Sequence, residues 1–254
     1  MRNLYYSLIR PLGIIRRMVL KYASMGQVLV PPTKTWSFQR DHFMKNLGIS
    51  LAIDVGGNLG QWALEARKIS NARIVTFEPD PRCHHYLDSL SAEDPTWEIV
   101  QKAAGNTDST VVMNLLKIEH GYSSLKDLTR LGENFSGERT QEIESHEVQV
   151  GRLDTHFKDD ISESDRIWLK IDVQGYEEEV LEGAIGILAN ITAVEIEIPM
   201  LKLYENSAKV STIVKFFEDQ EFVLCSIFSD RWSKNGVADC DALFVKAVAL
   251  NELK

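Results

Sequence analysis

The chain has 254 residues, of which 44% are hydrophobic and 26% are charged, and these fractions are typical of a folded globular protein. Its net charge of −9 repels phosphate backbones, so the composition disfavours nucleic-acid binding and favours a small-molecule or glycan partner. The sequence contains no run of about 18 apolar residues, so no membrane span is predicted. Its three cysteines are far apart in the sequence, which argues against a disulfide framework, so we expect a cytoplasmic protein.

The first 40 residues are basic, because they contain seven Lys and Arg residues and no Asp or Glu, which leaves a net charge of −16 on the rest. In residues 4–24, apolar side chains gather on one face of a predicted helix and basic ones lie mostly off it. Residues 1–24 can therefore either cap the domain or make peripheral contact with an anionic membrane surface at its inner face. Pro31 and Pro32 then predict an extended linker, and a short helix follows near residues 36–46. We treat residues 1–47 as a basic amphipathic N-terminal helical extension and residues 48–254 as one folded domain.

From residue 51 onward, apolar strands alternate with amphipathic helices. Strands are predicted at residues 51–55, 74–77, 97–104, 110–116, 146–150, 167–173, 191–198, 222–228 and 242–248. Helices are predicted at residues 61–70, 81–90, 176–188 and 207–219. This alternation predicts an α/β fold with a doubly wound, mostly parallel, seven-stranded Rossmann-like sheet. The last two strands follow one another without a helix, so we expect an antiparallel C-terminal edge hairpin.

A glycine-rich turn joins the first strand to the first helix and reads Asp54-Val55-Gly56-Gly57-Asn58-Leu59-Gly60. Glycine permits a tight turn and lets a ligand approach the backbone beside the helix N-terminus. Glu78 ends the second strand, where an acidic side chain in such a sheet reaches both hydroxyls of a ribose. Because the turn matches neither G-x-G-x-x-G nor the P-loop pattern, neither a dinucleotide nor a nucleoside triphosphate is indicated.

Three motifs resemble those of FkbM-family methyltransferases, which have the class I methyltransferase fold. The glycine turn fits D-x-G-x-N-x-G, Phe77-Glu78-Pro79 fits F-E-P, and residues 170–177 fit K-I-D-V-E-G-x-E, followed by V-L-x-G-A at residues 180–184. The resemblance covers residues 50–248 and departs at Gln174, where the family usually has Glu. It implies an S-adenosylmethionine-dependent methyltransferase, usually acting on an oxygen of a sugar, glycolipid or other secondary metabolite.

The resemblance also implies where the cofactor binds. The loop glycines and Asn58 are expected at its methionine part, Glu78 at the ribose and Ala103 near the adenine. Tyr122 and Ser123, with the following serine, resemble a G-x-S-S-L stretch that orients cofactor or acceptor, although such a stretch can also be a surface loop. The expected cofactor-binding residues are Asp54, Gly56, Gly57, Asn58, Gly60, Glu78, Ala103 and Ser124.

Four further residues are candidates for chemistry or acceptor binding. Asp172 ends a strand at the active-site edge and is the expected base, unless it caps the next helix or pairs with Lys170. His120 could enter the acceptor pocket or be a solvated loop histidine. Glu195 and Glu197 alternate along one strand, so they share a face and could bind sugar hydroxyls, hold a divalent ion or face solvent. Metal dependence and oligomeric state are left open.

Three functions are compatible with these features. The first is O-methylation of a sugar, glycan or glycolipid hydroxyl. The second is N- or C-methylation of another small metabolite. The third is a catalytically silent module with the same fold that docks partners through its basic N-terminus, although the retained loop and Glu78 argue against it.

Overall fold

The computed structural model describes residues 36–116, 124–132, 143–229, 232–233 and 236–253. The sheets and the pocket belong to one compact unit, Arg40–Lys254. The helix predicted near residues 36–46 is confirmed as α2 (Trp36–Asn46), whereas residues 1–24 and the proline linker lie outside the described residues. No helix in the described part of the chain is long and apolar enough to cross a membrane.

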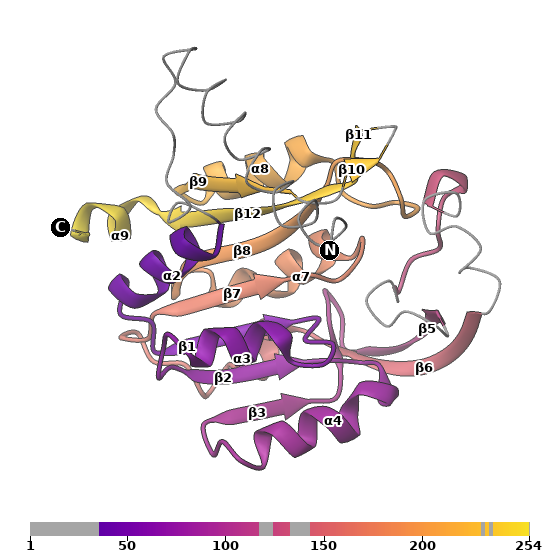
Figure 1. The fold of residues 1–254 in the computed structure, drawn as a ribbon, viewed down its shortest axis with the longest axis horizontal. Coiled ribbons are helices and arrows are strands. Elements are labelled where there is room, and N and C mark those ends of the chain that lie inside the picture. The colour runs from indigo at the N-terminus through magenta and orange to yellow at the C-terminus, as the bar shows by residue number, and fades with distance from the viewer. Residues whose placement is uncertain (1–35, 117–123, 133–142, 230–231, 234–235, 254) are drawn as a thin grey trace, which may run out of the picture. The chain divides into compact units, whose positions relative to one another are not determined.

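The main sheet has seven strands, as predicted, and Figure 1 shows them side by side. Five neighbouring strands, β3, β2, β1, β7 and β8, run parallel, and the pairings of β12 with β8 on one side and with β9 on the other are both antiparallel. The C-terminal hairpin is therefore confirmed, but its second strand is inserted between β8 and the edge strand β9. In order across the sheet, the strands are β3 (Trp97–Val100), β2 (Arg73–Phe77), β1 (Leu51–Val55), β7 (Ile167–Ile171), β8 (Ile191–Pro199), β12 (Asp239–Lys246) and β9 (Phe222–Phe228).

The two faces of this sheet differ in chemistry because side chains alternate along each strand. One face is apolar and joins the hydrophobic core with α7 (Glu177–Gly183) and α8 (Val210–Asp219). The other face carries a row of polar side chains, and Trp62 of α3 (Gln61–Arg67) donates a hydrogen bond to one of them. Strand β2 leads into α4 (Pro81–Ser91), which begins with an Asp80 cap that accepts a hydrogen bond from the Arg82 amide.

The single strand predicted at residues 97–104 is wrong. The chain turns after β3, and β4 (Ala103–Ala104) pairs with β6 (Ile143–Gly151) in a second sheet. That sheet is completed by β5 (Ser109–Leu116), in the order β4-β6-β5. The break has a functional consequence, because it carries Ala103 and Ala104 away from the main sheet and into the wall of a pocket.

The helix predicted at residues 176–188 is also shorter than expected. It ends at Gly183 and is followed by a 3₁₀ turn, η4 (Ile185–Ile187). The other small elements are α6 (Leu153–His156), α9 (Ala247–Glu252) and the hairpin of β10 (Trp232–Ser233) with β11 (Gly236–Val237). Helix α9 takes the place of the last residues of the strand predicted at 242–248.

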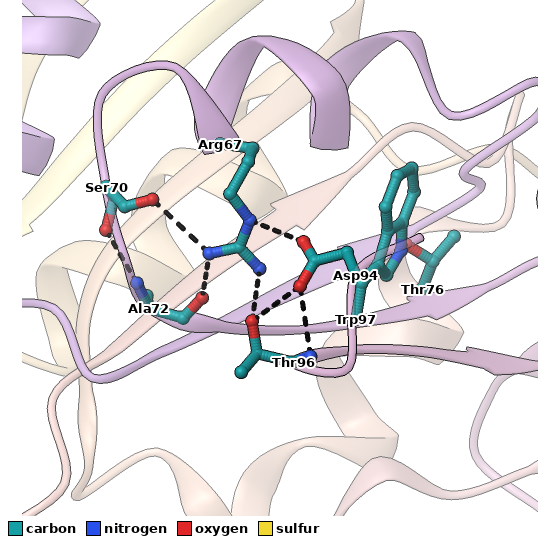
Figure 2. A network of polar contacts seen from close by, with 7 residues as sticks. All are labelled: Arg67, Ser70, Ala72, Thr76, Asp94, Thr96 and Trp97. Carbon is teal, nitrogen blue, oxygen red and sulfur yellow. Dashed lines mark hydrogen bonds and ion pairs between the residues drawn. The ribbon is translucent and has the colours of Figure 1, made fainter. Parts of the chain in front are cut away.

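A polar network fixes the end of α3 to the beginnings of β2 and β3 (Figure 2). Arg67 donates to the Ala72 carbonyl at 2.8 Å, to Asp94 at 2.7 Å and to the Thr96 hydroxyl at 3.0 Å. This one guanidinium satisfies a turn carbonyl and a carboxylate together, which is the charge-assisted arrangement expected to be strong. It holds in place the helix whose other end carries the glycine turn.

Candidate active site

A pocket opens where β1, β2 and β7 end, which is the edge at which parallel α/β sheets bind ligands. Each of these strands contributes the residues that directly follow it, and the small sheet contributes an apolar wall. The lining residues are Gly56, Asn58, Glu78, Pro79, Cys83, Ala103, Ala104, Met113, Ser124, Leu125, Asp172, Val173, Gln174 and Tyr176.

The glycine turn is shaped by close backbone contacts. Gly56 has a φ of 80°, and a Cβ atom there would lie 1.9 Å from the Asp172 carbonyl oxygen. Gly57 packs so closely on β2 that a Cβ would lie 2.1 Å from the Thr76 methyl carbon, and Gly60 has a φ of 79° at the start of α3. Gly56 lets the turn after β1 lie directly against the residue that follows β7, so the turn and Asp172 form one wall.

Glu78 braces this turn from the end of β2. Its two carboxylate oxygens accept hydrogen bonds from the Asn58 amide and the Asp80 amide, each at 2.7 Å. Burial raises the pKa of Glu78 to about 7, although the two hydrogen bonds oppose that rise. Each oxygen can accept more than one hydrogen bond, so the carboxylate can brace the turn and also accept ligand hydroxyls.

A row of buried charges crosses the main sheet, and its lysine contacts Asp172 at the pocket. Asp54, Lys170 and Glu195 are aligned by register across β1, β7 and β8, and all three are buried. Burial raises the pKa of Asp54 to about 6. Burial lowers the pKa of Lys170, but the carboxylates of Asp172 and Asp54 outweigh it and raise that pKa. Lys170 therefore stays charged. Asp172, at the pocket, contributes most to stabilising that charge, and Asp54 contributes next.

Asp172 stands at the pocket wall with both oxygens engaged. Its Oδ2 lies 2.9 Å from Lys170 Nζ, and its Oδ1 accepts from Gln174 Nε2 at 2.9 Å. Of the two structural roles considered from the sequence, the pairing with Lys170 is present. The capping role is wrong, because α7 follows Tyr176 with no side-chain cap. The Asp172 side chain is 35% exposed, so it remains accessible from the pocket.

The other predicted residues fall into three groups. Ser124 is buried in the pocket wall and donates to the Gln174 carbonyl at 2.7 Å. Glu195 is 3% exposed and accepts from Trp62 at 2.9 Å, whereas Glu197 accepts from Gln174 at 2.8 Å, so the substrate-binding role of this pair stays a prediction. His120, Tyr122 and Ser123 lie outside the described residues. The described residues contain no group of three side chains suited to a metal ion.

Several pocket residues were not predicted from the sequence. Ala104 and Met113 form the apolar wall, and the alternation in residues 110–116 was the only available signal for the methionine. Gln174 was noted only as a departure from the FkbM pattern, and nothing near Tyr204 in the sequence indicated that its hydroxyl would reach that glutamine.

The sequence pattern of the family described as "Methyltransferase FkbM domain" matches residues 54–224. The chain belongs to this family. It is therefore an S-adenosylmethionine-dependent methyltransferase, and the matched segment includes the glycine turn, Glu78 and Asp172. No curated protein matches the chain.

Solved structures of similar fold are distant in sequence. A precorrin-6y C5,15-methyltransferase from Geobacter metallireducens is 12% identical, with 87% of this chain and 94% of that chain covered and a TM-score of 0.43. An rRNA methylase from Streptococcus thermophilus is 11% identical, with 86% and 99% covered and a TM-score of 0.46. Magnesium protoporphyrin IX methyltransferase from Synechocystis, solved with bound SAM, is 10% identical, with 83% and 78% covered and a TM-score of 0.45. None of them bears on the acceptor of this FkbM-family enzyme.

Proposed function

We propose that this FkbM-family enzyme transfers the methyl group of S-adenosylmethionine to a hydroxyl oxygen of a sugar, glycan, glycolipid or similar small metabolite. The observation that carries the proposal is Asp172, a partly exposed carboxylate at the pocket wall whose two oxygens are held by Lys170 and Gln174. A hydroxyl must lose its proton during transfer, and a fixed carboxylate is a suitable acceptor for it.

The chemistry of the pocket fits the methyl donor. Glu78 offers a carboxylate for the two ribose hydroxyls, and the facing apolar wall of Ala103, Ala104 and Met113 offers a surface for an adenine ring. S-adenosylmethionine, when bound, supplies a methyl group already activated by its sulfonium. The protein's own contribution is then to position the acceptor and to remove one proton.

Charge supports a small or glycan acceptor over a nucleic acid. Without the first 40 residues, the chain has a net charge of −16, and the carboxylates of Glu78 and Asp172 line the pocket. Asp54 and Glu195 are buried in the same sheet. A phosphodiester backbone would be repelled from this edge, whereas neutral sugar hydroxyls can donate hydrogen bonds to carboxylates.

Asp172→Asn tests the proposed base. We expect the rate of methyl transfer to fall roughly 10²–10⁴-fold, because the amide cannot take the proton. We also expect S-adenosylhomocysteine to bind with near wild-type affinity. The measurement is transfer of labelled methyl from S-adenosylmethionine to glycolipid and small-metabolite extracts, with the methylated atom located by NMR.

Asp159→Asn, an exposed change of the same kind, is the matched control and should leave the rate unchanged. Label found on nitrogen or carbon would replace the O-methylation proposal with the corresponding alternative. A protein that binds the methyl donor but labels nothing in either extract would support a silent module.

A further inference from the structure

The side chain of Gln174 uses all of its hydrogen-bonding groups at the pocket wall. Its Nε2 donates to Asp172 Oδ1 at 2.9 Å and to Glu197 Oε2 at 2.8 Å. Its Oε1 accepts from the Tyr204 hydroxyl at 3.0 Å. A carboxamide has two N–H donors, and here each one meets a carboxylate. The amide thus forms a bridge between two negatively charged groups that come from different strands.

The backbone at this position is as closely fixed as the side chain. Gln174 has a φ of 53°, in the left-handed region that costs a non-glycine residue energy. Its carbonyl accepts from Ser124 Oγ at 2.7 Å, and a Cβ on Gly175 would lie 2.8 Å from the Tyr204 Cβ. A strained residue persists only where its surroundings hold it, and here four side chains do so.

The amide is the group that this site requires chemically. Lys170 donates to Asp172 Oδ2, and among the described residues several carboxylates act on Asp172 or on Lys170, including Asp54 from β1, Glu195 from β8 and Asp241 from β12. An ionised Glu at position 174 has no N–H to donate and would add another negative charge. The bridge therefore gives Asp172 a second fixed donor without adding charge.

We propose that Gln174 is a positioning residue that orients the Asp172 carboxylate toward the methyl donor by bridging it to Glu197. This inference rests on the proposed function, in which Asp172 faces the reacting group. A carboxylate held close to the sulfonium stabilises S-adenosylmethionine, which carries that charge, relative to S-adenosylhomocysteine, which does not. The preference between these two ligands therefore reports the position of Asp172.

The experiment measures the dissociation constants of both ligands by calorimetry for the wild type, Asp172→Asn, Gln174→Met and Asp159→Asn. Gln174→Met keeps length and net charge but removes the bridge. We expect Asp172→Asn and Gln174→Met each to lower the preference for S-adenosylmethionine by about three- to tenfold, the effect of one contact between unit charges at about 4 Å in a water-like dielectric. Asp159→Asn, an exposed change that removes the same charge outside the site, should change the preference by less than about twofold.

A second variant guards against misfolding. Gln174→Asn tolerates the left-handed backbone, but its side chain is too short to span both carboxylates, so the preference should fall here as well. A purely structural role would weaken both ligands equally and leave the preference unchanged.

The outcomes separate the two proposals. If the wild type binds neither ligand, both are overturned. If Asp172→Asn leaves the preference unchanged, Asp172 does not face the sulfonium, and the positioning role falls with it. If Asp172→Asn lowers the preference but neither Gln174 variant does, the positioning role alone is wrong and the proposed function stands.

Discussion

At the scale of single residues, the three loop glycines serve different purposes although they are alike in the sequence. Gly56 and Gly60 adopt left-handed backbone angles, whereas Gly57 does not. Position 57 leaves no room for a side chain, because Thr76 of β2 lies against it. Thr76 in turn accepts a hydrogen bond from the Trp97 indole at 2.9 Å, so its displacement would cost that bond. Figure 2 shows the two side chains next to each other.

Gly57→Ala should therefore destabilise the protein by about 1–3 kcal/mol through overpacking. The cause can be tested by adding Thr76→Ser, which removes the obstructing methyl but keeps the hydroxyl that bonds Trp97. Denaturant unfolding should show that the double variant recovers most of the lost stability. If Gly57→Ala lowers the free energy of unfolding by the same amount with Thr76 and with Thr76→Ser, the Thr76 methyl is not the obstruction.

The residues that line the pocket were predictable where a motif marks the end of a strand. Gly56, Glu78 and Asp172 follow β1, β2 and β7, and parallel strands bring their carboxyl ends to one edge. Gln174 and Tyr204 were not predictable as a pair, because their contact depends on how the segment after β8 folds back over the β7 turn. No local pattern encodes that long-range contact.

At the scale of elements, the strands of the main sheet were predicted better than the ends of the helices. Mainly apolar runs marked the strands at 51–55 and 222–228, and both were found at those positions. The first is buried throughout, whereas the second is the edge strand, in which only Phe222 is buried. The end of α7 depends on a contact that is distant in the sequence. A Cβ on Gly183 would lie 1.9 Å from the Gly105 carbonyl oxygen, so the helix is pressed against the small sheet at that point.

Gly183→Ala should destabilise the protein, although alanine is the better helix former by about 1 kcal/mol. The new methyl group must displace backbone, so we expect a loss of at least about 2 kcal/mol, as for overpacking in a core. Gly151→Ala is the control, because its Cβ would meet no atom closer than 3.6 Å. In thermal unfolding, we expect a lower midpoint than in the wild type for Gly183→Ala but not for Gly151→Ala. A higher midpoint for Gly183→Ala would mean that the helix propensity of alanine outweighs the clash with the Gly105 carbonyl.

At the scale of the whole molecule, the groups that we assign to cofactor binding and to the chemical step lie at one edge of the main sheet. The glycine turn, the carboxylates of Glu78 and Asp172 and an apolar wall from a second sheet meet there. Strand alternation predicted the main sheet and this edge. It did not predict the second sheet, because the departure of residues 103–104 is caused by pairing with β6 rather than by any break in apolar character.

The most direct measurement is calorimetric titration of S-adenosylhomocysteine into the wild type and Glu78→Ala, at pH 6 and pH 8. We expect Glu78→Ala to weaken binding at least about 100-fold, because two charge-assisted hydrogen bonds of about 1.5–3 kcal/mol each are lost. Since burial raises the pKa of Glu78 to about 7, the carboxylate is mostly protonated at pH 6 and ionised at pH 8. Wild-type affinity should thus rise between pH 6 and pH 8, and the variant should lack that rise. Glu93→Ala, an exposed change, should behave as the wild type. Equal affinity of wild type and Glu78→Ala, or no binding by the wild type, would contradict the account.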